Sequence, residues 1–149
     1  MSTLKNDRFQ WGAAQAIVIL VLSVTILAIS YQSLCVELKQ EEVLNILICL
    51  INGTIMFQLL SCISIIGAMV SYGAKMEDPH FDGKPSPNLN AMFKVGLICH
   101  IAGVASFACQ MFYQILHADI NSTTAFLSLA FSLFFFGVLA EVTKSLPLP

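Results

Sequence analysis

The chain has 149 residues, of which 57% are hydrophobic and only 11% are charged. A soluble domain of this length needs a charged exterior, with about a quarter of its residues charged, whereas lipid accepts apolar side chains on the outside of a fold. The formal net charge is −2, so no basic field exists to attract nucleic acid, and that class of partner is excluded. Composition therefore predicts an integral membrane protein.

Long apolar segments follow one another along the chain. We predict membrane-spanning helices over residues 11–35, 43–73, 94–117 and 122–142. Each segment has the roughly 20 residues that a helix needs to cross a hydrocarbon core of about 30 Å. Because the first and last pairs of segments are joined by very short connections, neighbouring helices should run antiparallel. The sequence thus predicts an all-α fold in which residues 1–149 form a single antiparallel four-transmembrane-helix bundle.

The only long connection covers about residues 75–93. Its prolines and its glycine, Pro79, Gly83, Pro85 and Pro87, oppose regular structure. We expect this segment to be a loop between the second and third spans.

The basic residues predict the orientation of the bundle. All but one of them lie beside the predicted loop or near the chain ends: Lys5, Arg8, Lys75, Lys84, Lys94 and Lys144, with Lys39 as the exception. Lys and Arg are retained on the cytoplasmic face, so both termini and the 75–93 loop should be cytoplasmic. Trp and Tyr prefer the headgroup level, and each of them lies near the end of a predicted span: Trp11, Tyr31, Tyr72 and Tyr113.

The third span has the clearest polar face. At 100° per residue, one side of this helix carries Gly96, Cys99, His100, Gly103, Phe107, Gln110 and Gln114. Glycines allow close helix approach, and polar groups in lipid seek protein partners, so this face should point into the bundle. Tight packing with interhelical hydrogen bonds is favoured over a substrate path, because one His without a carboxylate is a poor proton relay.

The second span carries a comparable stripe, formed by Asn45, Cys49, Asn52, Met56, Ile63, Gly67 and Ser71. Asn52 is its most costly member, since an unpaired amide in lipid is strongly disfavoured. A partner on the third span is the simplest explanation, and a ligand contact is the alternative.

Residues that could carry chemistry are few. The spacing Asp78-x-His80-x-Asp82 is weak evidence for a metal site, and an open acidic turn is the favoured interpretation. The five cysteines form no C-x-x-C pair. We predict no catalytic, metal or cofactor site. The site residues are expected to serve helix packing or to line a path: Asn52, Gly67, Gly96, His100, Gly103, Gln110 and Gln114.

These features favour a non-catalytic tetraspan membrane protein, not an enzyme. We expect an accessory or structural subunit of a larger membrane assembly, in contact with lipid and, as a hetero- or homo-oligomer, with other integral membrane proteins. The alternative is a small transporter or channel subunit, with a polar path between the second and third spans. A membrane enzyme acting on lipids is a third class, but no residue constellation supports it.

Overall fold

The computed structural model describes residues 2–39, 45–117 and 137. Three helices make up this part of the chain: α1 (Ser2–Glu37), α2 (Asn45–Met76) and α3 (Pro87–His117). All three are long and apolar enough to cross a membrane. The prediction of an all-helical, multi-pass membrane protein is therefore confirmed, but the described residues show three helices and not four. Apart from residue 137, the predicted span over residues 122–142 lies outside them.

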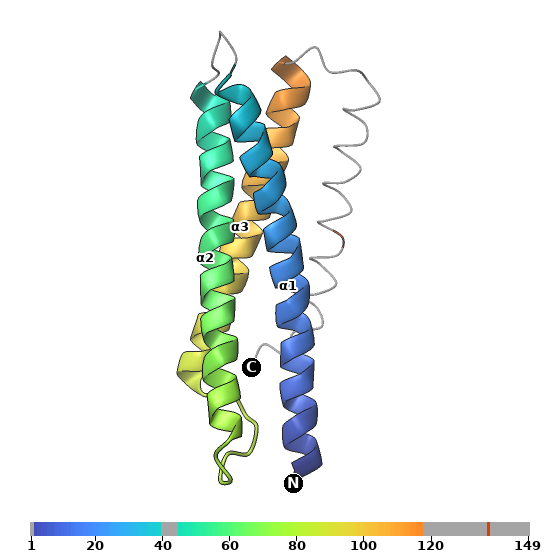
Figure 1. The fold of residues 1–149 in the computed structure, drawn as a ribbon, viewed down its shortest axis with the longest axis vertical. Helices are drawn as coiled ribbons and strands as arrows, with labels where there is room; N and C mark the ends of the chain where they lie inside the picture. The colour runs from blue at the N-terminus through green and yellow to red at the C-terminus, as the bar shows by residue number, and fades with distance from the viewer. Residues whose placement is uncertain (1, 40–44, 118–136, 138–149) are drawn as a thin grey trace.

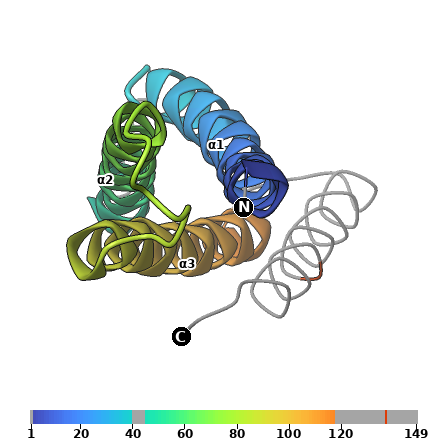
Figure 2. The ribbon, with the colours of Figure 1, turned by 90° about the horizontal axis from the view of Figure 1, so that it is seen from below.

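The three helices alternate in direction along one common axis (Figure 1). Viewed from below, they form a triangle in which the segment after α2 crosses towards α3 (Figure 2). α2 packs extensively against both α3 and α1, whereas α1 and α3 make few contacts with each other. The N-terminal end of α1 lies at the same end of the bundle as residues 77–86, and this end is called the loop end below.

The helices extend beyond the predicted spans. They contain 36, 32 and 31 residues, which correspond to roughly 54, 48 and 46 Å at 1.5 Å per residue. A hydrocarbon core is only about 30 Å thick. Part of each helix must therefore reach into the headgroup region or beyond it.

The predicted loop bounds are corrected at Pro87, which opens α3 instead of lying in the loop. Proline suits the first position of a helix, where its missing N–H has no partner to lose. Ser86 caps the same helix, because its Oγ accepts a hydrogen bond from the Leu89 N–H at 3.4 Å. α3 thus begins at Pro87 and not at residue 94, and the loop is confined to residues 77–86.

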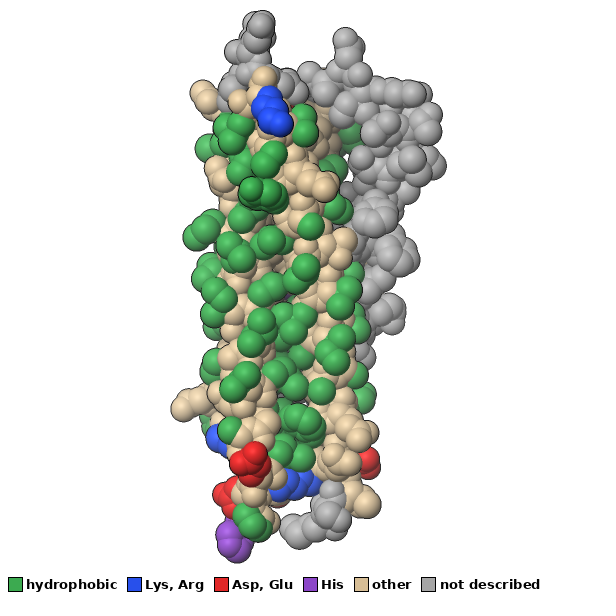
Figure 3. All heavy atoms as spheres, viewed as in Figure 1, with side chains coloured by type: hydrophobic (Ala, Val, Ile, Leu, Met, Phe, Trp, Pro, Cys, Tyr) green, Lys and Arg blue, Asp and Glu red, His purple; other side chains and the backbone are tan. Residues whose placement is uncertain are grey.

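The core lies along the inner faces of the three helices. Its main apolar cluster consists of Ala16, Ile19, Ile26, Ile65, Leu97, Val104 and Phe107. The visible outer surface is apolar along most of its length, and the charged side chains gather near its two ends (Figure 3). An apolar exterior of this kind is suited to lipid or to the apolar surface of another membrane protein.

Two exposed aromatic residues of α1 indicate where this helix would meet the two boundaries of the hydrocarbon core. Trp11 and Tyr31 are 45% and 61% exposed, and their positions are about 30 Å apart along the helix axis. This separation matches the thickness of a hydrocarbon core whose boundaries Trp and Tyr prefer. Residues of α1 near the midpoint, such as Ser23, therefore lie close to the middle of the span.

Candidate functional site

A buried polar cluster joins all three helices. Nδ1 of His100 on α3 lies 2.8 Å from Oγ of Ser23 on α1 and 2.9 Å from Oε1 of Gln58 on α2. All three side chains are fully buried. Since Ser23 is near the middle of α1, this cluster lies at a depth where water is scarce and each hydrogen bond replaces a costly unpaired group.

The cluster leaves one ring nitrogen of His100 without a partner. If Nδ1 carries the proton, it donates to Gln58 Oε1 and to Ser23 Oγ, and Nε2 is a bare acceptor. If Nδ1 is unprotonated, the Ser23 hydroxyl donates to it, and the Gln58 amide must turn its nitrogen towards the ring. In both cases His100 Nε2 has no hydrogen-bond partner in the described part of the chain.

Further polar groups continue the cluster along the helices. Ser30 Oγ lies 3.5 Å from Gln110 Oε1, between α1 and α3. Ser106 of α3 donates to the Leu50 carbonyl of α2 at 3.0 Å. Three more buried atoms are unpartnered among the described residues, namely Gln58 Nε2, Ser61 Oγ and Gln110 Nε2. The bundle interior therefore offers more hydrogen-bonding capacity than the described contacts use.

Small residues on α3 make this cluster sterically feasible. A β-carbon at Gly103 would lie 2.5 Å from Gln58 Nε2, and one at Gly96 would lie 2.7 Å from Ile65 Cδ1. Both separations are shorter than van der Waals contact, so the two glycines allow α2 and α3 to approach closely. The geometry is the one expected for small residues at a membrane helix interface.

The structure brings together most, but not all, of the residues singled out in the sequence. His100, Gly103, Gln110 and Gly96 are buried on the inner face of α3. Gln114 is half-buried further along the same helix.

For α2, the prediction from the sequence agrees less well with the structure. Gly67 is half-buried, with Met92 Cε 3.0 Å from the position of an added β-carbon. Asn52 is exposed, and it lies only seven residues from the start of α2 at Asn45. The amide is thus close to the end of the helix, where it does not need the buried partner that a mid-span position would require.

The polar stripe predicted for the second span did not include the polar residues that α2 buries. The inner face of this helix carries Leu47, Ile51, Thr54, Gln58, Ser61, Ile65, Ala68 and Tyr72. These positions are spaced alternately by three and four residues, which is the repeat of one helix face. A search for that repeat centred on Gln58 would have found the face.

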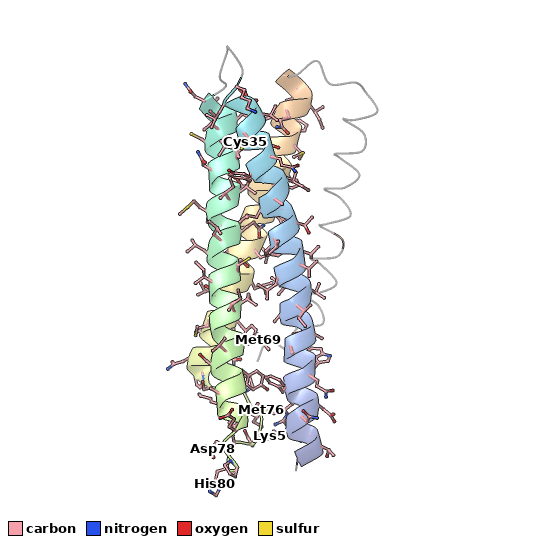
Figure 4. The ribbon with its side chains drawn as sticks, in the orientation of Figure 1. Lys5, Cys35, Met69, Met76, Asp78 and His80 are labelled. Atoms are coloured by element: carbon pink, nitrogen blue, oxygen red, sulfur yellow. The ribbon has the colours of Figure 1, made fainter. Side chains whose placement is uncertain are left out.

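At the loop end, aromatic and basic side chains hold α1, α2 and the 77–86 loop together. Tyr72 donates its hydroxyl hydrogen to the Gly83 carbonyl at 2.6 Å, and its ring makes edge contacts with Phe9 and Phe81 at centroid distances of 5.2 and 6.0 Å. Lys5 donates to the Asp78 carbonyl at 2.8 Å, and Figure 4 shows these two residues near each other at the loop end. The loop is therefore anchored to the N-terminal part of α1.

The acidic turn predicted in the loop has local hydrogen bonds of its own. Asp78 Oδ1 accepts from the His80 N–H, and Asp82 Oδ1 accepts from the Lys84 N–H, each at 2.9 Å. These are the short-range contacts by which Asp stabilises a turn. In the described residues, no group of three or more His, Cys, Asp or Glu side chains is arranged to hold a metal ion.

A cavity of about 650 Å³ lies at the loop end, between the N-terminal parts of α1 and α3. Tyr72 of α2 and the Lys84-Pro85 segment complete its lining. Its innermost lining residues along the two helices are Ile19 and Leu97, which precede Ser23 and His100 by four and three residues. The cavity therefore ends about one helical turn, or roughly 5 Å, from the polar cluster.

Comparison with known proteins identified no relative of this chain. No protein-family model, no curated protein and no solved structure matches this chain.

Proposed function

We propose that this protein is a non-catalytic tetraspan subunit that serves an accessory or structural role in a larger membrane assembly. In this proposal residues 122–142 supply the fourth span, and both termini and the 77–86 loop are cytoplasmic. Its partners are other integral membrane proteins, which it contacts through lipid-facing apolar side chains.

The observation that carries the proposal is the division between a closed polar interior and an apolar exterior. Ser23, Gln58 and His100 are each 0% exposed, so their hydrogen bonds join helices and do not face a solute. Large apolar side chains are exposed on α1, α2 and α3 alike. Such a bundle is built to remain folded in lipid and to present its surface to neighbours.

The basic residues support the proposed orientation. Lys5, Arg8 and Lys75 contact the loop or its flanks, through Asp78, Asp82 and Ser86. The loop end therefore combines a cluster of cations with the N-terminal end of the chain. Such a cluster favours the cytoplasmic side.

One observation favours a second candidate, a small transporter. The loop-end cavity approaches the polar cluster, and Ile19 and Leu97 alone mark its inner limit along α1 and α3. Movement of these two side chains would extend the cavity towards His100. In that candidate the cluster is a midplane binding site that opens to one side.

The accessory proposal is tested by photo-crosslinking in cells that express the full chain at native level. A crosslinking amino acid replaces Ile17, Ile63 or Ile98, one per outer helix face, which are 59%, 66% and 64% exposed. Controls carry it at Ile26 and Ile65, which are fully buried. We expect a protein adduct of discrete mass from at least one exposed site and none from the buried sites. Adducts with lipid alone from every exposed site would contradict the proposal.

A second experiment separates the two candidates. The purified, monodisperse protein is placed alone in liposomes, and solute flux is compared with that of His100→Ala. An accessory subunit should produce no solute flux without its partner. Flux that depends on His100 would replace the accessory proposal with the transporter.

A further inference from the structure

We propose that the loop-end cavity is a binding site for an anionic phospholipid. The headgroup phosphate lies among the cations at the outer rim, and an acyl chain lies against the apolar inner wall. This inference rests on the proposed cytoplasmic orientation of the loop end, and in the transporter candidate the same cavity would be the entrance to the polar cluster.

The rim of the cavity has an excess of positive charge. Arg8, Lys84 and Lys94 line it together with a single carboxylate, that of Asp7. The chain as a whole has a net charge of −2, so this local excess is not a general property of the protein. Cations gathered in this way favour a negatively charged headgroup.

Two of these cations are available to a ligand. In the described part of the chain, the side chains of Lys84 and Lys94 form no hydrogen bond or ion pair. Arg8 donates to the Asp82 carbonyl at 3.3 Å, which holds its guanidinium near the rim while leaving further N–H donors. A phosphate at the rim would thus meet two uncommitted ammonium groups and a guanidinium in a fixed place.

The inner wall of the cavity is apolar. From Asp7 to Ile19 its lining on α1 extends inward by roughly 18 Å, and the side chains pass from charged to apolar in that direction. On α3 the innermost lining residue, Leu97, is likewise apolar and lies inward of Lys94. This order matches an amphiphile with its charge at the rim, whereas a free inorganic anion would leave the apolar wall uncovered.

The separation of two helices provides room for an acyl chain. Among the described residues, α1 and α3 line opposite walls of the cavity and make few contacts with each other. A volume of about 650 Å³ lies within the roughly 300–1,000 Å³ of known small-molecule sites. Basic pockets between transmembrane helices on the cytoplasmic side commonly hold anionic headgroups, and the loop end is the side proposed to be cytoplasmic.

The chain provides its own reporter for this site. Trp11 is the only tryptophan of the protein, and it lines the cavity. The full-length protein is reconstituted in phosphatidylcholine vesicles that contain a small fraction of brominated phosphatidylglycerol, and Trp11 quenching is measured. A parallel series contains brominated phosphatidylcholine at the same mole fraction. We expect the anionic lipid to quench Trp11 at lower mole fractions than the zwitterionic lipid.

Lys84→Gln and Lys94→Gln test the rim, because neither change removes a side-chain contact described in the protein. Each should lower the preference for the anionic lipid by about fivefold. Lys75→Gln is the control at the same end, since Lys75 does not line the cavity, and it also removes the hydrogen bond from Lys75 to Ser86. Lys39→Gln is the control at the opposite end. Both controls should retain the preference.

Three results would overturn the proposal. Equal quenching by the two brominated lipids would show that no anionic site exists. An equal loss in Lys75→Gln and Lys94→Gln would assign the preference to the general field of the loop end. Release of the brominated lipid by millimolar inorganic phosphate would identify a site for free phosphate instead of a lipid headgroup.

Discussion

The amide of Gln58 on α2 packs directly against Gly103 on α3, at a place where a β-carbon on residue 103 would lie only 2.5 Å from Gln58 Nε2. Oε1 of the same glutamine lies 2.9 Å from Nδ1 of His100, within hydrogen-bond distance. Close backbone approach and the buried hydrogen bond therefore depend on each other, because a larger residue at position 103 would displace the amide from His100.

Gly103→Ile should destabilise the bundle, by about 1–3 kcal/mol, because the branched side chain cannot be accommodated beside Gln58. Ala105→Ile adds the same kind of bulk on the exposed side of α3 and should be nearly neutral. Folded yield and thermal unfolding in detergent measure both. Equal tolerance of the two substitutions would show that the buried face of α3 is assigned wrongly.

The hydrogen bond between His100 and Gln58 should appear as a coupling energy. A double-mutant cycle with His100→Leu and Gln58→Leu is expected to give about 0.6–1.7 kcal/mol, from the average to the maximum measured for hydrogen bonds between membrane helices. The matched cycle pairs His100→Leu with Asn52→Leu, which removes an exposed amide. That cycle should give a coupling near zero, and a coupling as large as that of Gln58 would mean that Asn52 also contacts the cluster.

Tyr72→Phe should loosen the 77–86 loop without unfolding α2. The change removes the 2.6 Å hydrogen bond to the Gly83 carbonyl but keeps a ring that can pack on Phe9 and Phe81. A loss of about 1 kcal/mol is expected, seen as roughly fivefold faster amide hydrogen exchange in the loop. Tyr31→Phe is the control, since Tyr31 is exposed at the other end of the bundle. Unchanged exchange in Tyr72→Phe would show that the ring contacts alone hold the loop.

Two glycines should respond to alanine in opposite ways. Gly83 has a φ of +82°, and an added β-carbon would lie 2.9 Å from the Lys5 Cα, so Gly83→Ala should destabilise the loop by about 1–2 kcal/mol. Gly73 lies within α2 with nothing within 4 Å of an added β-carbon, so Gly73→Ala should stabilise the helix by roughly 0.5–1 kcal/mol. Thermal unfolding measures both effects. The loop geometry would be refuted by an equally stabilising Gly83→Ala.

The orientation can be read by labelling single cysteines in a background without the five native ones. A cysteine at position 84 should be protected from an impermeant thiol reagent in intact cells and should react after permeabilisation. A cysteine at position 39, near the other end of α1, should react in intact cells. The reverse pattern would invert the proposed topology.

The sequence alone determined that the described residues form long apolar helices, because a charge-poor segment of this length can satisfy its backbone polar groups in lipid only as a helix. It also determined the inner face of α3, where Gly96, His100, Gly103 and Gln110 recur at helical spacing. Both results depend on local composition and periodicity, which require no knowledge of neighbouring helices.

Only the tertiary structure decided which polar residues of α2 are inside. Asn52 and Gln58 are both amides within one apolar segment, and their cost in lipid is similar when each is considered alone. The rotation of α2 against α3 buries Gln58 beside His100 and Gly103 and leaves Asn52 exposed. The loop-end cavity likewise arises from the separation of α1 and α3, because its cations and its apolar wall come from segments distant in the chain. Such a site depends on packing angles between helices, which hydrophobic periodicity within one segment does not specify.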